Sequence, residues 1–467
     1  MTNPQCIQKV SAEHILKKEK ELACDYDNLT HYDVMVLTKY CSETQSNLAT
    51  HTLLASLFTG RSIEDLLNKA VTINASVSSG FGTLHSTIEH PRSPCSSGCD
   101  KINPEVDNAA PYIFLPSTIL VSILSARAFE KTLIDQLNSY LAEINKNKGT
   151  RLTLGRIKRY LFKEAACLNI SQTEACWISN TRLRDHAGSS YLSMSSTELA
   201  LKHYRFINNI MLISGLGPFD VLKLLDCPNS KERIGSNRAL SDQDLQNELT
   251  KIKLSVQEAY SKFPATIWQI FNTFTHYAVT LLNLCTSHRS TRAPYGTLDN
   301  FDLIRKVVWI EDKKARTAAS RLIPLNSIGT AQIQYYISFL SKFYELVKYS
   351  YPIDAEHIQM SLKSEADLFS LRGRSGMTFY SNTNVREICD FELPSASNWN
   401  RHWIKQFLAT QSRVDATAVD AFMGHENLLD ESFSRFSNLD TAELRKIVDA
   451  IEKRLINLNV QALEVSL

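Results

Sequence analysis

Residues 306–325 read KVVWIEDKKARTAASRLIPL and carry the clearest β-strand signal in the chain. Apolar, β-branched runs at 306–310 and 321–325 flank a polar, basic segment, an arrangement typical of a β-hairpin. Outward from this hairpin, apolar residues recur at three- and four-residue spacing, which predicts amphipathic helices. We therefore expect a mainly α-helical fold, in which a helical N-terminal portion precedes a C-terminal α+β domain with a small β-hairpin or sheet.

The same spacing suggests where the domains lie. A chain of 467 residues is too long for one ordinary domain. We expect a helical N-terminal portion at 1–225, which a Ser-, Gly- and Pro-rich loop at about 75–110 could divide into two subdomains. Within this loop, residues 76–99 could also form a loosely held hairpin. The polar segment 226–241 is the expected linker, and 242–467 the expected C-terminal domain. Helices are expected at 197–225, 242–284, 331–349, 399–410 and 440–458, and an irregular segment at 352–394.

Composition limits the function classes. The net charge of +2 means that a nucleic-acid surface would have to come from local clusters of Lys and Arg. The N-terminal residues are polar, so we expect a cytoplasmic protein whose cysteines are free thiols. Cys95 and Cys99 have no further ligands beside them, and no apolar run reaches the roughly 18 residues of a membrane helix. We expect no metal, no cofactor and no membrane.

A basic segment at 146–163 contains seven Lys and Arg residues and no acidic residue. It would suit a surface that follows a nucleic-acid backbone. The alternative is the solvated face of a helix, and the sequence leaves both interpretations open.

Four features near the C-terminus follow one another in a suggestive order. Arg289 ends the segment Thr286-Ser-His-Arg, which follows an apolar helix, and Lys313 lies in the predicted hairpin. Arg401 lies in Asn398-Trp-Asn-Arg-His, at the start of a helix, and His425 follows a glycine. Each feature alone has an ordinary structural explanation, such as a helix cap or a solvated turn. The separation between Arg289 and Lys313 equals that between Arg401 and His425.

This order resembles the tyrosine recombinases, also called phage-type integrases, over roughly residues 271–444. The resemblance implies that Arg289 and Arg401 grip the non-bridging oxygens of a DNA phosphate. It implies that Lys313, with Lys314 as its nearest rival, protonates the leaving oxygen, and that His425 hydrogen-bonds the phosphate. Asn398 stands where the family has a first histidine; an amide can bond a phosphate but cannot relay a proton. The further DNA-binding residues expected on this face are Arg292, Arg305, Lys306, Lys314, Arg316 and His402.

The expected nucleophile is missing. The family places a tyrosine eight to ten residues after its last histidine, and that window holds Phe433 and Ser434 here. A tyrosine from elsewhere or from a partner subunit could enter the site, or Ser434 could substitute. As a third alternative, the protein binds DNA without cutting it, beside an active recombinase.

We therefore expect a double-stranded DNA-binding protein of site-specific recombination or integration, of the kind found on mobile genetic elements. It would associate with itself or with a partner recombinase on DNA. The rival hypothesis is a non-catalytic helical scaffold or regulator that binds protein partners. Salt-dependent binding to duplex DNA discriminates the two.

Overall fold

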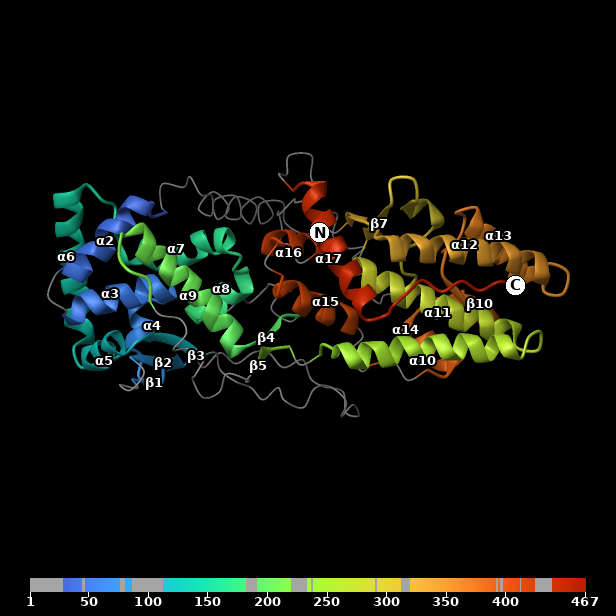
Figure 1. Ribbon diagram of the computed structural model, residues 1–467, viewed down its shortest axis with the longest axis horizontal. Coiled ribbons are helices and arrows are strands. Elements are labelled where there is room, and N and C mark those ends of the chain that lie inside the picture. The colour runs from blue at the N-terminus through green and yellow to red at the C-terminus, as the bar shows by residue number, and fades with distance from the viewer. Residues whose placement is uncertain are drawn as a thin grey trace, which may run out of the picture. The chain divides into compact units, whose positions relative to one another are not determined.

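The computed structural model describes residues 28–43, 47–75, 80–85, 112–181, 191–219, 233–236, 238–289, 292–311, 320–391, 394, 398–411, 413–424 and 439–467. The chain forms two compact units (Figure 1). Unit 1 comprises Met1–Cys95, Glu105–Ser189 and Met194–Gly235, and unit 2 comprises Ser96–Pro104, Ser190–Ser193 and Ser236–Leu467. The expected mainly helical fold is confirmed, and the described sheets are small and antiparallel. Unit 1 gives way to unit 2 at Ser236, inside the segment 226–241.

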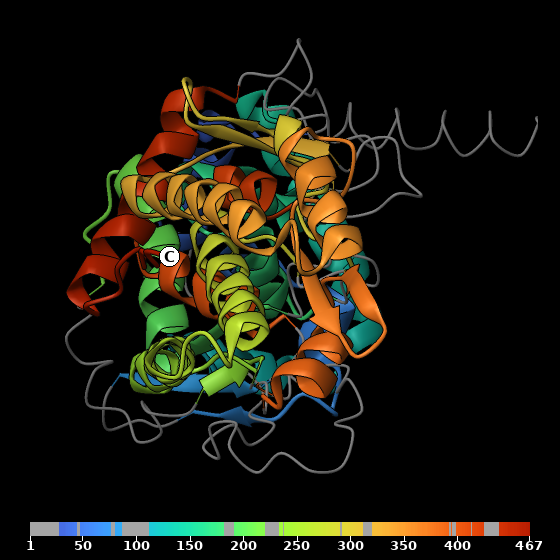
Figure 2. The ribbon, with the colours of Figure 1, turned by 90° about the vertical axis from the view of Figure 1, so that its right-hand side faces the viewer.

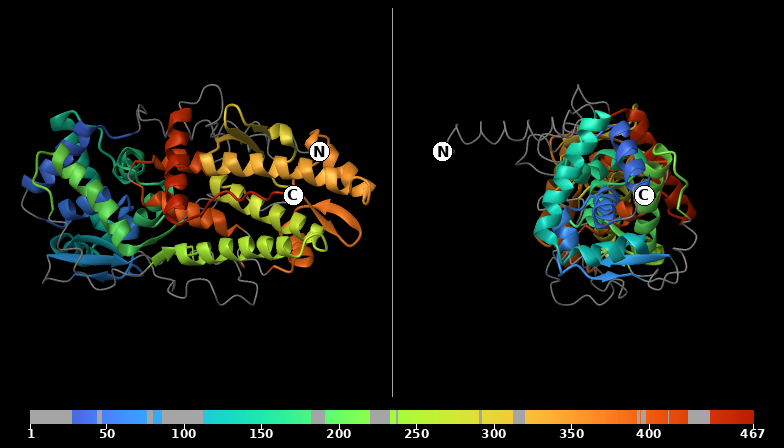
Figure 3. Two further views of the ribbon diagram at one scale, coloured as in Figure 1. Left: turned by 45° about the vertical axis from the view of Figure 1, so that its right-hand side comes forward. Right: turned by 90° about the vertical axis from the view of Figure 1, so that its left-hand side faces the viewer.

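Unit 1 is built around one buried helix. Its described helices are α2 (His31–Glu43), α3 (Leu48–Thr59), α4 (Ile63–Leu67), α5 (Ser117–Ala126), α6 (Glu130–Lys148), α7 (Leu154–Ala165), the 3-10 helix η1 (Ala166–Leu168), α8 (Gln172–Ser179) and α9 (Ser196–Ile213). The helix α3 is apolar on nearly all sides and is buried from Thr52 to Thr59. It contacts α2, α4, α5, α6 and α7, which surround it in Figure 3 (right).

A three-stranded antiparallel sheet completes unit 1. It has the order β1 (Ile73–Asn74), β2 (Phe81–His85), β3 (Tyr112–Pro116). Strand β2 lies within the segment expected at about 75–110 to be a loop or a loosely held hairpin, and it pairs antiparallel with β1. Residues 76–79 and 86–110 lie outside the described part. Glycine is required at position 82, since an added Cβ would lie 2.4 Å from the carbonyl oxygen of Asn74. A separate two-stranded sheet pairs β4 (Ser193–Ser195) with β5 (Arg233–Gly235).

Unit 2 is likewise organised around one buried helix. Its described helices are α10 (Asp242–Ser261), α11 (Ile267–Thr286), the 3-10 helix η4 (Leu298–Asn300), α12 (Ser327–Val347), α13 (Pro352–Leu362), α14 (Asn382–Cys389), α15 (Trp399–Ala409), α16 (Ala416–Met423) and α17 (Thr441–Asn457). Every residue of α11 from Ile270 onward is buried, because α10, α12, α14, α15 and α17 all contact it. Figure 2 shows α11 at the centre of these helices.

The predicted hairpin is present in unit 2. Strand β7 (Val307–Glu311) pairs antiparallel with β8 (Ser320–Pro324), and β6 (Phe301–Asp302) adds a short third strand. The alternation of side chains buries Val308, Ile310 and Ile323 and leaves Trp309 and Leu322 exposed. The expectation of an irregular segment at 352–394 was wrong, because it contains α13, α14 and the hairpin of β9 (Ser370–Gly373) and β10 (Gly376–Phe379). The two strands are only four residues long each and flank a turn at Gly373 and Gly376, which resembles a loop signal in the sequence.

The C-terminal residues pack within unit 2. Helix α17 buries the predicted stripe of Leu444, Ile447, Val448, Ile451 and Leu455, and Asp440 caps its first turn by accepting a hydrogen bond from the Ala442 N–H. The extended segment that follows lies along α10, α11 and α12 (Figure 1). Three side chains of those helices bond its backbone. The Tyr277 hydroxyl donates to Gln461 O, the Tyr260 hydroxyl to Ser466 O, and Gln332 pairs with both backbone groups of Leu463.

Candidate functional site

The turn at the end of α11 is the first component of the candidate site. Ser287 adopts the left-handed conformation that ends the helix, with φ of 56°. The Thr286 hydroxyl oxygen accepts a hydrogen bond from the His288 N–H and lies 2.9 Å from the Tyr295 hydroxyl. Tyr295 in turn donates to the side-chain oxygen of Asn283 at 3.0 Å. These buried bonds fix the turn, so the carbonyl oxygen of Ser287 has a defined direction.

Arg401, on the first turn of α15, joins this turn to a third segment. Its Nη1 donates to the carbonyl oxygen of Ser287 at 2.8 Å, and its Nη2 donates to the carbonyl oxygen of Met423 at the end of α16. Arg401 is fully buried. A single guanidinium therefore holds together the residue two positions before Arg289 and the residue two positions before His425.

Arg321 of β8 brings the hairpin to the same point. It is also buried, and its Nη2 lies 3.4 Å from the carbonyl oxygen of Ser287. The end of α11, the start of α15, the end of α16 and the strand β8 thus meet around one backbone carbonyl. An ion pair between Lys405 and Asp420, 2.5 Å from Nζ to Oδ1, fastens α15 to α16.

Asn400 is a second bridge between α15 and α11. Its side-chain Nδ2 donates to the carbonyl oxygens of His288, at 2.8 Å, and of Asn283, at 3.2 Å. Asn400 is almost completely buried. Because one amide group donates to two carbonyls at the end of α11, this residue positions the turn that carries Arg289.

The side chain of His402 is buried within unit 2. Its Nδ1 lies 2.8 Å from the Ser236 hydroxyl, and its ring packs on Tyr191 with centroids 4.5 Å apart. The guanidinium of Arg401 lies 5.2 Å from the same Tyr191 ring. Burial and the charges of Arg238 and Arg401 lower the pKa of His402 to about 3, so the imidazole is uncharged at neutral pH.

The remaining predicted site residues fall into two groups. Arg289 is half-buried beside the turn, and Asn398 caps α15 through its backbone carbonyl, which accepts from the Arg401 N–H at 3.0 Å. Arg292 stacks on Phe379 at 3.7 Å, while Arg305 and Lys306 are exposed in the turn between β6 and β7. The others, Lys313, Lys314, Arg316, His425, Phe433 and Ser434, lie outside the described residues. Lys313, Lys314 and Arg316 belong to the chain between β7 and β8, and His425 directly follows Gly424.

The basic segment at 146–163 uses several of its charges internally. Arg156 donates to the carbonyl oxygen of Arg151 at 2.8 Å, Arg159 to that of Gly155 at 3.4 Å, and Lys163 to that of Leu29 at 2.6 Å. Lys146 and Lys148 are exposed at the end of α6. Several cations of this segment therefore make hydrogen bonds within unit 1.

Sequence reasoning missed three residues of this site: Arg321, Asn400 and Tyr191. A signal existed only for Arg321. In a strand with alternating burial, Arg321 shares the inward face with Ile323, and a charged residue at such a position calls for a specific partner. Asn400 and Tyr191 had no such signal, because their contacts lie more than a hundred positions away in the chain.

Comparisons with known proteins add no relative. The chain matches no protein-family model, no curated protein and no solved structure. Within the part that the structure describes, no group of three or more His, Cys, Asp or Glu side chains could hold a metal ion. The described helices include none with both the length and the apolar character that crossing a membrane requires.

Proposed function

We propose that this chain is a DNA-binding protein of site-specific recombination or integration, built on a C-terminal domain like that of the tyrosine recombinases, and that it does not cut DNA by itself. The observation that carries the proposal is the pair of hydrogen bonds from Arg401 to Ser287 and Met423. These bonds draw together three of the four segments in which the resemblance places phosphate-binding residues. The fourth segment, the hairpin, reaches the same carbonyl through Arg321.

In this proposal the two buried arginines organise the site, and more accessible cations bind the phosphates. Arg289 follows the carbonyl that Arg401 and Arg321 share, and Arg305 and Lys306 are exposed in the turn next to the hairpin. Phosphate binding by such side chains releases counterions from DNA, which makes the affinity depend steeply on salt.

Two buried tyrosines of unit 2, Tyr295 and Tyr380, are poorly suited to act as nucleophiles. The hydroxyl of Tyr295 donates to Asn283, and that of Tyr380 lies 2.8 Å from His276 Nδ1. Both residues are buried, and burial raises the pKa of Tyr380 well above its usual value, which disfavours the nucleophilic phenolate. Strand transfer would then depend on a partner recombinase.

One observation favours the rival, a helical scaffold that binds proteins. Arg401 and Arg321 are fully buried and bond to backbone, so neither reaches a phosphate without breaking those bonds. In that reading the four segments converge for stability alone, and no DNA surface exists.

Binding to a random 30-base-pair duplex at several salt concentrations separates the two functions. We expect binding whose logarithm falls linearly with the logarithm of the salt concentration, with a slope of about −0.9 for each phosphate contacted. Arg305→Ala should make that slope shallower by about 1, whereas Arg374→Ala, an exposed arginine in the turn between β9 and β10, should not change it. Undetectable binding at low salt, or a flat salt dependence, would overturn the proposal and favour the scaffold.

A further inference from the structure

Unit 1 and unit 2 contain corresponding elements in the same order. In unit 1 the buried helix α3 is followed by α4, a three-stranded sheet and α5; in unit 2 the buried helix α11 is followed by η4, a three-stranded sheet and α12. The strands of both sheets are antiparallel, follow chain order and have lengths of 2, 5 and 5 residues. In each sheet the first residue of the second strand pairs with the proline that ends the third, Phe81 with Pro116 and Val307 with Pro324. The last helix of each unit contacts that third strand, α9 with β3 and α17 with β8.

The buried helix of each unit ends in the same turn. Its last residue is Thr59 in unit 1 and Thr286 in unit 2. The next residue is left-handed in both, with φ of 65° at Gly60 and 56° at Ser287. Each threonine hydroxyl donates to the carbonyl four residues earlier, at 2.7 and 2.8 Å, and accepts from the N–H two residues later, at 3.3 Å in both. The agreement between the units therefore extends to individual hydrogen bonds.

A buried arginine joins this turn to a second helix end in each unit. In unit 1, Arg61 directly follows the turn, and its Nε donates to the carbonyl oxygen of Ile178 on α8 at 3.1 Å. In unit 2, Arg401 bonds the turn and donates to the carbonyl oxygen of Met423 on α16. Both arginines are fully buried, and α8 and α16 are each eight residues long and end in a left-handed residue. The same two helix ends are thus linked through a guanidinium in both units.

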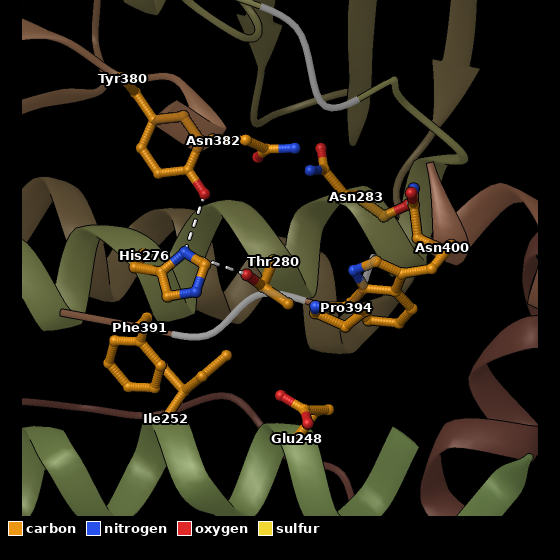
Figure 4. A pocket seen from close by; sticks show the side chains of 11 residues that line it. Glu248, Ile252, His276, Thr280, Asn283, Tyr380, Asn382, Phe391, Pro394 and Asn400 are labelled. Atoms are coloured by element: carbon orange, nitrogen blue, oxygen red, sulfur yellow. Dashed lines mark hydrogen bonds between the residues drawn. The ribbon is translucent and has the colours of Figure 1, made fainter. Parts of the chain in front are cut away.

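Helix α7 of unit 1 corresponds to α15 of unit 2. Figure 4 shows Asn400 of α15 beside Asn283 of α11, whose backbone carbonyl accepts from the Asn400 side chain at 3.2 Å. In unit 1, α7 contacts α3 and α8, as α15 contacts α11 and α16. It also passes close to the turn, because a Cβ added at Gly60 would lie 3.1 Å from Leu161 Cβ and 3.3 Å from the carbonyl oxygen of Lys158.

Helix α7 presents cations, and no carboxylate, to solvent. Its one acidic residue, Glu164, is buried and lies 3.3 Å from His31 Nε2. Arg159 uses its Nε for the carbonyl of Gly155 in its own helix, and the side chain of Lys158 forms no hydrogen bond or ion pair with the described residues. Cations along one helix without exposed acidic residues suit the phosphates of a DNA backbone. The partly exposed cations of α7 are Arg156, Lys158, Arg159 and Lys163.

We infer that the chain is a tandem repeat of one fold, and that unit 1 binds a DNA backbone of its own through Lys158 and Arg159 of α7, beside the turn at Gly60. One chain then binds two duplex segments, one with each unit. Arg61 stays buried and holds the turn, as Arg401 does in unit 2. The choice of DNA as the ligand rests on the proposed function, whereas the repeat does not.

The number of duplexes that one full chain binds tests this inference. A short fluorescein-labelled duplex is titrated with the protein at low salt, at concentrations above the dissociation constant, and fluorescence anisotropy gives the stoichiometry. We expect two duplexes per chain. The double variant Lys158→Ala/Arg159→Ala should bind one, because only unit 2 still binds, and Arg305→Ala/Lys306→Ala should bind one through unit 1.

A matched control removes two exposed cations of unit 1 from other helices. Lys39→Ala/Arg205→Ala, on α2 and α9, should still bind two duplexes. Circular dichroism shows whether each variant is folded. If the α7 double variant is not, the single change Lys158→Glu replaces it and should weaken the binding of one of the two duplexes at least tenfold.

The outcomes separate this inference from the proposed function. One duplex per unmodified chain, lost in Arg305→Ala/Lys306→Ala and kept in the α7 variant, would overturn the inference and leave the proposed function standing. One duplex per chain that only the α7 variant loses would support DNA binding by unit 1 and contradict the proposed function of unit 2. Absence of binding would overturn both.

Discussion

Arg401 donates a hydrogen bond of 2.8 Å to the carbonyl oxygen of Ser287, which lies 114 positions earlier in the chain. This buried carbonyl oxygen lies at the end of α11, and Arg321 reaches it as well, at the longer distance of 3.4 Å. A buried carbonyl that lacks hydrogen bonds is costly. The same guanidinium bonds Met423 O at the end of α16. One side chain thus satisfies two helix ends and sets their relative position.

Arg401→Ala should therefore destabilise unit 2 strongly. Hydrogen bonds to a charged group contribute about 1.5–3 kcal/mol each, so the loss of two should lower the free energy of unfolding by about 3 kcal/mol or more. Urea denaturation followed by circular dichroism measures it. Arg374→Ala removes an exposed arginine and should change the stability by less than about 0.5 kcal/mol. Equal stability of the two variants would show that the Arg401 bonds are unimportant.

Stability should fall in mild acid because of buried histidines. Burial lowers the pKa of His276 and of His402 to about 3, from the ordinary value of 6.5. Between pH 6.5 and 3 these two histidines bind protons in the unfolded chain and not in the folded chain. The contribution of their neutral, buried state to the free energy of unfolding is therefore complete above pH 6.5 and is lost as the pH falls. Each histidine should then cost about 1.4 kcal/mol per pH unit as the pH falls through that window.

The variant His402→Gln tests this linkage. Its free energy of unfolding, measured in urea between pH 7 and pH 5, should depend on pH less steeply than that of the unmodified chain. The comparison of slopes cancels the contribution of the carboxylates, which both proteins share. Parallel pH profiles would contradict the buried, neutral state of His402.

Two glycines of unit 1 should respond to alanine in opposite ways. An added Cβ at Gly82 would meet Asn74 O at 2.4 Å and the Leu120 side chain at 2.6 Å, so Gly82→Ala must displace the sheet from α5. At Gly155, on α7, the Cβ would meet nothing within 4 Å. Because alanine favours helix over glycine, Gly155→Ala should raise the stability by up to about 1 kcal/mol. Thermal unfolding should rank Gly155→Ala above the unmodified chain and Gly82→Ala below it.

The protein alone should form no covalent adduct with a nicked suicide DNA substrate. The hydroxyls of Tyr295 and Tyr380 are buried and hydrogen-bonded, and the usual nucleophile window holds no tyrosine. Denaturing electrophoresis detects an adduct, and mass spectrometry maps it. An adduct that disappears in Tyr191→Phe would contradict the non-cleaving proposal and identify the ring beneath Arg401 as the source of the nucleophile.

Periodicity was enough to predict the hairpin and the helices near it, because both depend on neighbours in the chain. The strands β7 and β8 were expected within one residue of their ends, and α15 and α17 likewise. The prediction for the segment 352–394 was wrong because its helices and strands are short. Its turns at Gly373 and Gly376 resemble loop signals when no partner strand is known.

Local sequence alone determined that the chain is mainly helical, that a hairpin lies at 306–325, and that Arg289, Arg401 and Gly424 follow one another at helix ends. Only the tertiary structure decided that Arg401 and Arg321 turn inward to the carbonyl of Ser287. It also placed the amide of Asn400 against the carbonyls of Asn283 and His288 in that turn. The reason is physical: the direction and burial of a long polar side chain depend on which distant backbone groups lack partners, and spacing along the chain does not encode those groups.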